Sequence, residues 1–136
     1  MKTSIKDCFL ACVASFVLFY LIVALVGIAA AVAVPEGYFE WFRKKELLKF
    51  GFYLWDVLTI IPAQAIPTII ITYFFARYLA NNVKVFCAAL ILIYIVYYVV
   101  EYNSFGSFGV ALIYPLSIVL AGYLALKVKA KKSASD

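Results

Sequence analysis

The sequence contains no histidine and little charge of either sign. Its 136 residues include 7 acidic and 12 basic side chains, so charged residues make up 14% of the chain, against about 25% in soluble domains. Hydrophobic residues make up 68%, against roughly 45 to 50%. A soluble domain of this length needs more polar surface to cover its core. We therefore expect an all-α integral membrane protein.

The same absences limit the chemistry that the chain can perform. Structural zinc sites usually need four Cys or His ligands, and the sequence offers three cysteines, Cys8, Cys12 and Cys87. We expect these to be small packing residues that could meet at one depth in the membrane. No nucleophile with an adjacent base and no glycine-rich phosphate loop is present. We predict that the protein is not an enzyme and has no metal or cofactor.

Long uncharged runs predict four transmembrane helices, because about 20 apolar residues cross a hydrocarbon core of roughly 30 Å. The expected spans are 9–34, 51–76, 84–101 and 106–126, arranged as an up-down antiparallel bundle. Ala31-Val32-Ala33 also resembles a signal-peptide cleavage site. The apolar region of a signal peptide is only about 7 to 15 residues long, however, so a first transmembrane helix is favoured.

Segment 36–49 follows Pro35 and mixes aromatic with charged side chains. Glu40 and Lys44 have the i, i+4 spacing of a helical ion pair, which favours a short interfacial helix between the first and second spans. The incomplete apolar stripe of this segment weakens that prediction.

The last ten residues, 127–136, form a basic tail that we expect to be disordered and solvated on the cytoplasmic side. Basic residues lie in clusters at the ends of apolar runs, so the lipid bilayer is a simpler partner than nucleic acid. Anionic headgroups are expected at four lysines of the tail: Lys127, Lys129, Lys131 and Lys132.

Basic residues also predict the orientation of the chain. Eight lie on the side of the two termini (Lys2, Lys6, Arg77, Lys84, Lys127, Lys129, Lys131 and Lys132) and four on the other side (Arg43, Lys44, Lys45 and Lys49). The excess predicts cytoplasmic termini, most simply in a bacterial inner membrane. Four basic residues in a short translocated loop weigh against this orientation.

Polar residues of the second span are candidates for function. Asp56, Gln64 and Thr68 lie in an apolar run, where a charged or amide group needs a partner. Asp56 is either an ion or partner ligand, or a carboxylate near the interface within reach of Lys49 or water. Gln64 either satisfies a carbonyl freed by proline or binds a ligand.

Three prolines are candidate helix-break residues. Pro62 and Pro67 are expected to kink or locally unwind the second helix at mid-membrane, because each removes a backbone donor. Pro115 is a candidate second break in the fourth helix, and paired broken helices are typical of transporter sites.

Tyrosines of the third span share one face with its terminal acid. Tyr94, Tyr97, Tyr98 and Glu101 recur at i, i+3, i+4 and i+7. They could line a polar cavity together with Asp56, or form an interfacial aromatic belt. A belt explains Tyr98 but not Tyr94, which lies nearer mid-membrane.

Small residues predict where helices approach closely. Such residues recur in the first span at Ala24, Gly27 and Ala31, and near the fourth at Gly106, Gly109 and Gly122.

Two functions remain open at this stage. The first is a non-catalytic accessory subunit or immunity-like protein that packs against another membrane protein or a second copy. The second is an oligomeric small transporter or ion conduit that uses polar residues of the second and third helices.

Overall fold

The computed structural model describes residues 2–102 and 112–135, and in these ranges all regular secondary structure is helical. Its elements are α1 (Lys2–Ala30), α2 (Tyr38–Lys44), α3 (Leu48–Phe74), the π-helix η1 (Phe75–Leu79), α4 (Val83–Tyr102) and α6 (Ile113–Ser135).

Four helical stretches are long and apolar enough to cross a membrane: Ser4–Ala30, Leu48–Leu79, Val83–Val100 and Ile113–Ala134. The all-α, multi-pass character predicted from composition is therefore supported. The stretch Leu48–Leu79 has 32 residues and α4 has 20, so at about 1.5 Å per residue α3 with η1 is about 18 Å longer than α4.

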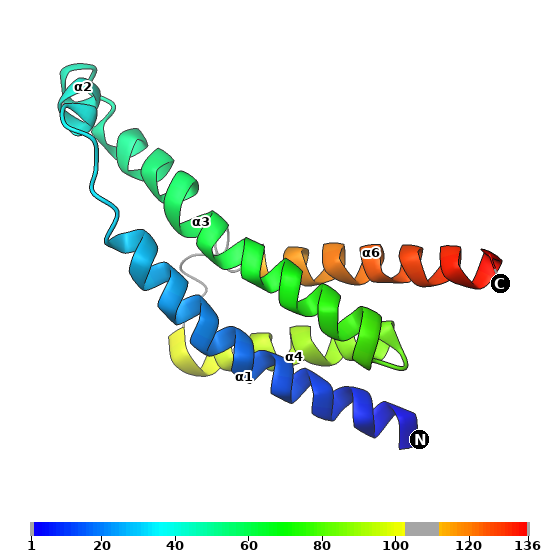
Figure 1. Cartoon of the computed structure of the whole chain (residues 1–136). Helices are drawn as coiled ribbons and strands as arrows, with labels where there is room; N and C mark the ends of the chain where they lie inside the picture. The colour runs from blue at the N-terminus through cyan, green and yellow to red at the C-terminus, as the bar shows by residue number, and fades with distance from the viewer. Residues whose placement is uncertain (1, 103–111, 136) are drawn as a thin grey trace.

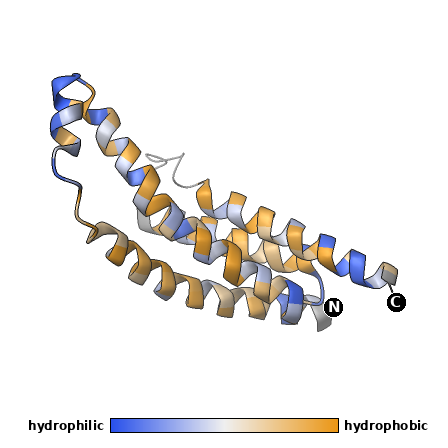
Figure 2. Cartoon of the chain, turned by 45° about the horizontal axis from the view of Figure 1, so that its top comes forward, coloured by the Kyte–Doolittle hydropathy of each residue, from blue (hydrophilic) through white to orange (hydrophobic). Residues whose placement is uncertain are grey.

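Both chain termini and the turn that joins η1 to α4 lie at one end of the molecule, while α2 lies at the opposite end (Figure 1). We call these the terminal end and the α2 end. Helices α1 and α6 each pack against both α3 and α4. The beginning of α3 extends with α2 beyond the other long helices (Figure 1). Apolar residues cover most of the helical surface, and hydrophilic residues interrupt α3 (Figure 2).

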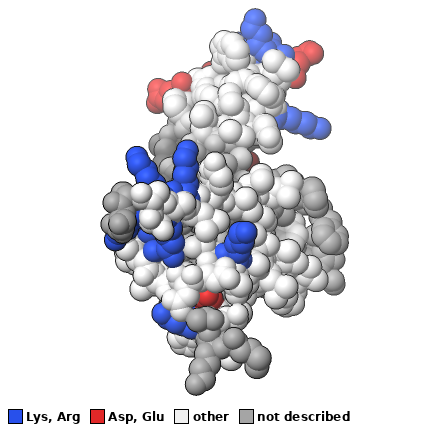
Figure 3. All heavy atoms as spheres, turned by 90° about the vertical axis from the view of Figure 1, so that its right-hand side faces the viewer, with Lys and Arg blue, Asp and Glu red and all other residues white. Residues whose placement is uncertain are grey.

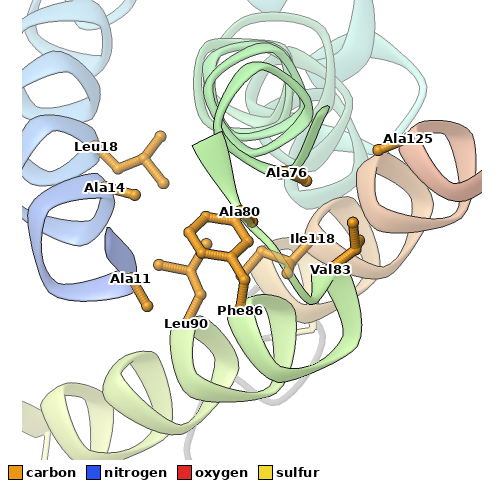
Figure 4. Close-up of a cluster of buried hydrophobic side chains, with 10 residues drawn as sticks. All are labelled: Ala11, Ala14, Leu18, Ala76, Ala80, Val83, Phe86, Leu90, Ile118 and Ala125. Carbon is orange, nitrogen blue, oxygen red and sulfur yellow. The ribbon is translucent and has the colours of Figure 1, made fainter. Parts of the chain in front are cut away.

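The buried core lies near the terminal end. Its members come from α1, η1, the turn after η1, α4 and α6, and five of them are alanines: Ala11, Ala14, Leu18, Ala76, Ala80, Val83, Phe86, Leu90, Ile118 and Ala125 (Figure 4). Alanine allows neighbouring backbones to approach closely, which is the usual basis of helix association in lipid. No residue is buried in three helical segments, 19–30 of α1, 52–66 of α3 and 91–100 of α4. We call these three segments, with α2, the α2-side half.

The prolines of α3 do not break it. The helix is continuous through Pro62 and Pro67, so the predicted local unwinding is wrong, while the alternative, a kink, stays a prediction. One proline removes a single backbone donor, and the intact turns on either side maintain helical geometry. The departure from α-helical geometry comes later, at η1, where the Ala80 amide donates to the Phe75 carbonyl at 2.9 Å.

Pro115 is also not a mid-helix break. Because α6 begins at Ile113, Pro115 lies in the first turn, where backbone amides have no intrahelical acceptor to lose. The predicted start of the fourth span at residue 106, with Gly106 and Gly109, lies outside the described residues.

The basic tail is helical rather than disordered, since α6 continues to Ser135. Alanine and lysine have high helix propensity, and Val128 and Lys129 are half-buried against the rest of the protein. The first helix, by contrast, ends at Ala30, five residues before Pro35.

Candidate functional site

The most completely satisfied polar site is centred on Asp7, near the start of α1. Its side chain is 0% exposed, and its carboxylate oxygens accept hydrogen bonds from the backbone amides of Asn81 and Asn82, each at 2.9 Å. These amides immediately precede α4, whose N-terminus attracts negative charge through the helix dipole. Asp7 therefore connects α1 to the turn between η1 and α4.

The same turn is held from a second side by α6. Lys129 donates through Nζ to the carbonyl oxygen of Ala80 at 2.8 Å. Within the turn, Asn82 Oδ1 accepts from the backbone amides of Lys84 at 3.1 Å and Val85 at 3.3 Å, as expected of a helix N-cap. We call Asp7, residues 80–82 and Lys129 the clamp. It joins the first, middle and last parts of the chain at one end.

Asp7 was not among the predicted site residues, because those residues were chosen for their positions within or at the ends of the later apolar runs. Two signals could have identified it. Asn81-Asn82 before an apolar run is an N-cap pattern, and Asp7 is the only acidic residue before Glu36.

Arg77 lies on η1, three residues before the clamp. It donates to the hydroxyl of Tyr73, and its guanidinium carbon lies 5.0 Å from the centre of the Tyr78 ring. The cation is thus held between two aromatic side chains near the terminal end.

Polar residues of α3 form an i, i+4, i+8 series of Gln64, Thr68 and Thr72. Both threonines are buried. Thr68 donates to the carbonyl of Gln64 at 2.7 Å, whereas Gln64 Oε1 and Thr72 Oγ1 are buried with no hydrogen-bond partner among the described residues. Satisfying a freed carbonyl would require the amide nitrogen of Gln64 as donor, so the unpartnered oxygen leaves that expected role a prediction.

Tyr94 joins two helices. Its ring centre lies 4.7 Å from that of Tyr114 on α6 and 6.1 Å from that of Tyr98 on α4. Through its contact with Tyr114, Tyr94 packs α4 against α6. Glu101 belongs to the last turn of α4, but its side chain is outside the described part.

Asp56 is exposed on α3. Over residues 2–102 and 112–135, no side chain forms an ion pair with it, and Lys49 does not reach it. Eight residues separate Asp56 from Gln64, or about 12 Å along the helix. The structure therefore does not bring Asp56 together with the buried polar series.

At the α2 end, α2 folds back onto the start of α3 through aromatic contacts. The Tyr38 hydroxyl donates to the Gly51 carbonyl at 3.0 Å, and its ring lies 5.4 Å from that of Trp55. Phe42 packs so closely on Gly51 that a Cβ there would lie 2.7 Å from the phenylalanine ring. Gly37 (φ 79°) and Glu46 (φ 57°) adopt left-handed backbone conformations on either side of α2. These two turns set the direction in which the chain enters and leaves α2.

Small residues pack closely at the terminal end, whereas close packing was also expected at Ala24, Gly27 and Ala31 of the first span. Gly122 on α6 lies against Cys87 on α4, where a Cβ would approach Sγ to 2.7 Å. Nothing in the described part of the chain lies within 4 Å of a Cβ built on Gly27, so Gly27 makes no close contact inside this bundle, and a contact with another chain stays a prediction. Cys8 and Cys12 are exposed whereas Cys87 is half-buried, so the three cysteines play different packing roles.

Among the residues that the structure describes, no group of three or more His, Cys, Asp or Glu side chains could hold a metal ion. Comparison with known proteins finds no match to a family model, a curated protein or a solved structure.

Proposed function

We propose that this protein is a non-catalytic accessory subunit or immunity-like protein of a bacterial inner membrane, and that it acts by packing against another membrane protein. The single observation that supports this proposal is that the α2-side half of α3 has no fully buried residue. Between Phe52 and Ile66 no residue is buried, and this segment carries the exposed carboxylate of Asp56, which has no ion-pair partner among the described residues. An exposed carboxylate on this otherwise apolar segment gives a partner a charged group to bind.

The proposed topology is an up-down antiparallel bundle with α2 as an interfacial helix and both termini in the cytoplasm. The excess of basic residues at the terminal end supports this orientation. A hydrocarbon core of about 30 Å matches the length of α4. With the terminal end at the inner surface, the start of α3 and α2 then reach the outer headgroups, where exposed Trp41 and Tyr53 are suitable interfacial side chains.

A site-specific photo-crosslinking experiment tests the proposed function. The probe amino acid replaces Tyr53 on α3 or, as a matched control, Tyr123 on α6, since these tyrosines are 66% and 61% exposed. In the native membrane we expect one discrete protein adduct from position 53, weakened by Asp56→Ala, and none from position 123. Equal adducts at both positions, or purification as a monomer without a stoichiometric partner, would contradict the proposal.

A second candidate function, an oligomeric transporter or ion conduit, is favoured by one observation. Gln64 Oε1 and Thr72 Oγ1 are buried without hydrogen-bond partners in residues 2–102 and 112–135, and such atoms could bind water or a polar solute. Flux of protons or small cations in proteoliposomes tests this function. Flux that falls in Gln64→Ala and Asp56→Asn supports a conduit, and flux unchanged in both removes it.

A further inference from the structure

The clamp gathers basic side chains from several helices onto the terminal end. Lys6 is adjacent to Asp7 on α1, Lys84 lies two residues after Asn82 on α4, and Lys127 lies on α6 two residues before Lys129. All three side chains are exposed. The clamp contacts place their backbones around one short turn, although they are far apart in the sequence.

Charge at this end is strongly unbalanced among the described side chains. The cations are Lys6, Arg77, Lys84, Lys127, Lys129, Lys131 and Lys132, and the acid is Asp7. Asp7 is buried and accepts two backbone hydrogen bonds, so its carboxylate faces the turn rather than the surface. Figure 3, which looks toward the end with the two termini, shows basic side chains over several elements of that end.

Lys129 has a different role from its neighbours. Its ammonium group is already bound to the Ala80 carbonyl, and the side chain is half-buried. Lys129 was expected to bind lipid headgroups, but its ammonium group is bound within the protein. Lys6 and Lys84, which lie on other helices, are exposed at the same end and can bind headgroups instead.

We infer that the terminal end forms a composite surface for anionic phospholipid headgroups, in which exposed Lys6, Lys84 and Lys127 from three helices contact lipid phosphate. Opposite charge and position argue for this occupant. These lysines lie at the ends of apolar helices, at the level where phosphates of an anionic leaflet concentrate, and each basic residue there attracts the leaflet. Exposed Tyr78 and Tyr123 on neighbouring elements supply the aromatic side chains common at this level. This inference does not depend on the proposed protein partner.

Lipid selectivity of the full chain tests the inference. The protein is reconstituted in phosphatidylcholine vesicles that contain spin-labelled phosphatidylglycerol or spin-labelled phosphatidylcholine, and the motionally restricted fraction of each label is compared. We expect the wild type to prefer phosphatidylglycerol by about threefold or more at low salt. That preference should fall toward one in about 0.5 M salt, where the Debye length is only a few ångströms.

The matched variants each lose three exposed lysines. Lys6→Gln/Lys84→Gln/Lys127→Gln removes them from the terminal end, and Lys44→Gln/Lys45→Gln/Lys49→Gln removes them from the α2 end. The first triple variant should lose most of the preference while the second retains it, with unchanged helical circular dichroism in both. Equal losses in the two variants, or full preference in the first, would overturn the inference. Competition by millimolar inorganic phosphate would also overturn it, because it would indicate a site for soluble anions rather than a lipid surface.

Discussion

The terminal end and the α2-side half are built from similarly apolar helices, yet they are held together in different ways. At the terminal end, alanines bring backbones together and the clamp connects three parts of the chain through hydrogen bonds. In the α2-side half, contacts between long helices include aromatic pairs such as Phe19 with Tyr97, whose ring centres are 5.9 Å apart. No residue in its segments of α1, α3 and α4 is buried. In lipid, apolar composition does not drive helices together, so packing follows small residues and polar bonds.

The largest expected effect is at Asp7. Asp7→Ala leaves the amides of Asn81 and Asn82 without acceptors, and hydrogen bonds to a charged group contribute about 1.5 to 3 kcal/mol each. We expect the free energy of unfolding to fall by about 3 kcal/mol, measured by denaturant titration in neutral lipid micelles. Asp56→Ala should change it by less than about 0.5 kcal/mol, because that carboxylate is exposed. Similar losses in the two variants would mean that the two regions are equally well held.

The next effect concerns close packing between α4 and α6. Gly122→Ala forces a Cβ against Cys87 Sγ and should cost about 1 to 3 kcal/mol, as overpacking usually does. Adding Cys87→Ala should restore part of this loss. The control Gly27→Ala fills open space in the α2-side half of α1 and should stabilise the protein by about 0.5 to 1 kcal/mol. Thermal melts followed by circular dichroism compare the three variants, and an equal loss from Gly122→Ala and Gly27→Ala would contradict the difference in packing.

A smaller loss is expected at Lys129. Lys129→Met retains much of the apolar stem but removes the donor to the Ala80 carbonyl, so we expect a loss of about 1 kcal/mol from this half-buried site. Lys131→Met, which changes an exposed lysine of the same helix, should have no measurable effect in the same unfolding assay. If both variants behave alike, α6 is held by its apolar contacts alone.

The smallest expected effect concerns the two buried threonines of α3, which lie between the α2-side half and the terminal end. Thr68→Val removes a hydrogen bond to the Gln64 carbonyl and should cost about 0.5 to 1 kcal/mol, whereas Thr72→Val removes a hydroxyl without a described partner and should be neutral or slightly stabilising. Unfolding midpoints of the two variants, measured side by side, provide the comparison. A larger loss for Thr72→Val would show that its hydroxyl is bonded in the membrane, by water or by a partner.

Sequence patterns predicted the four apolar helices and the short helix after the first because length, charge and aromatic content are local properties. They failed where partners are distant. Asp7 lies 74 residues from Asn81, and no spacing rule connects them. The tail was expected to be disordered because Lys129 looks like a solvated charge until the Ala80 carbonyl is placed beside it. The prolines were over-interpreted because the loss of one donor was equated with a broken helix. Among the candidate polar residues, Tyr94 and Thr68 have structural contacts, while the roles of Asp56 and Gln64 stay predictions.

The clamp also constrains the order of assembly during synthesis. Asp7 enters the membrane surface with the first helix, but its amide donors follow 74 and 75 residues later, and Lys129 comes 49 residues after its acceptor. The carboxylate of the first helix therefore has no amide donors until the segment with Asn81 and Asn82 has been made, and the turn is held from both sides only after residue 129 has been added. Final locking of the terminal end is then a late, non-local event, so a chain truncated before residue 129 would leave the turn held from one side only.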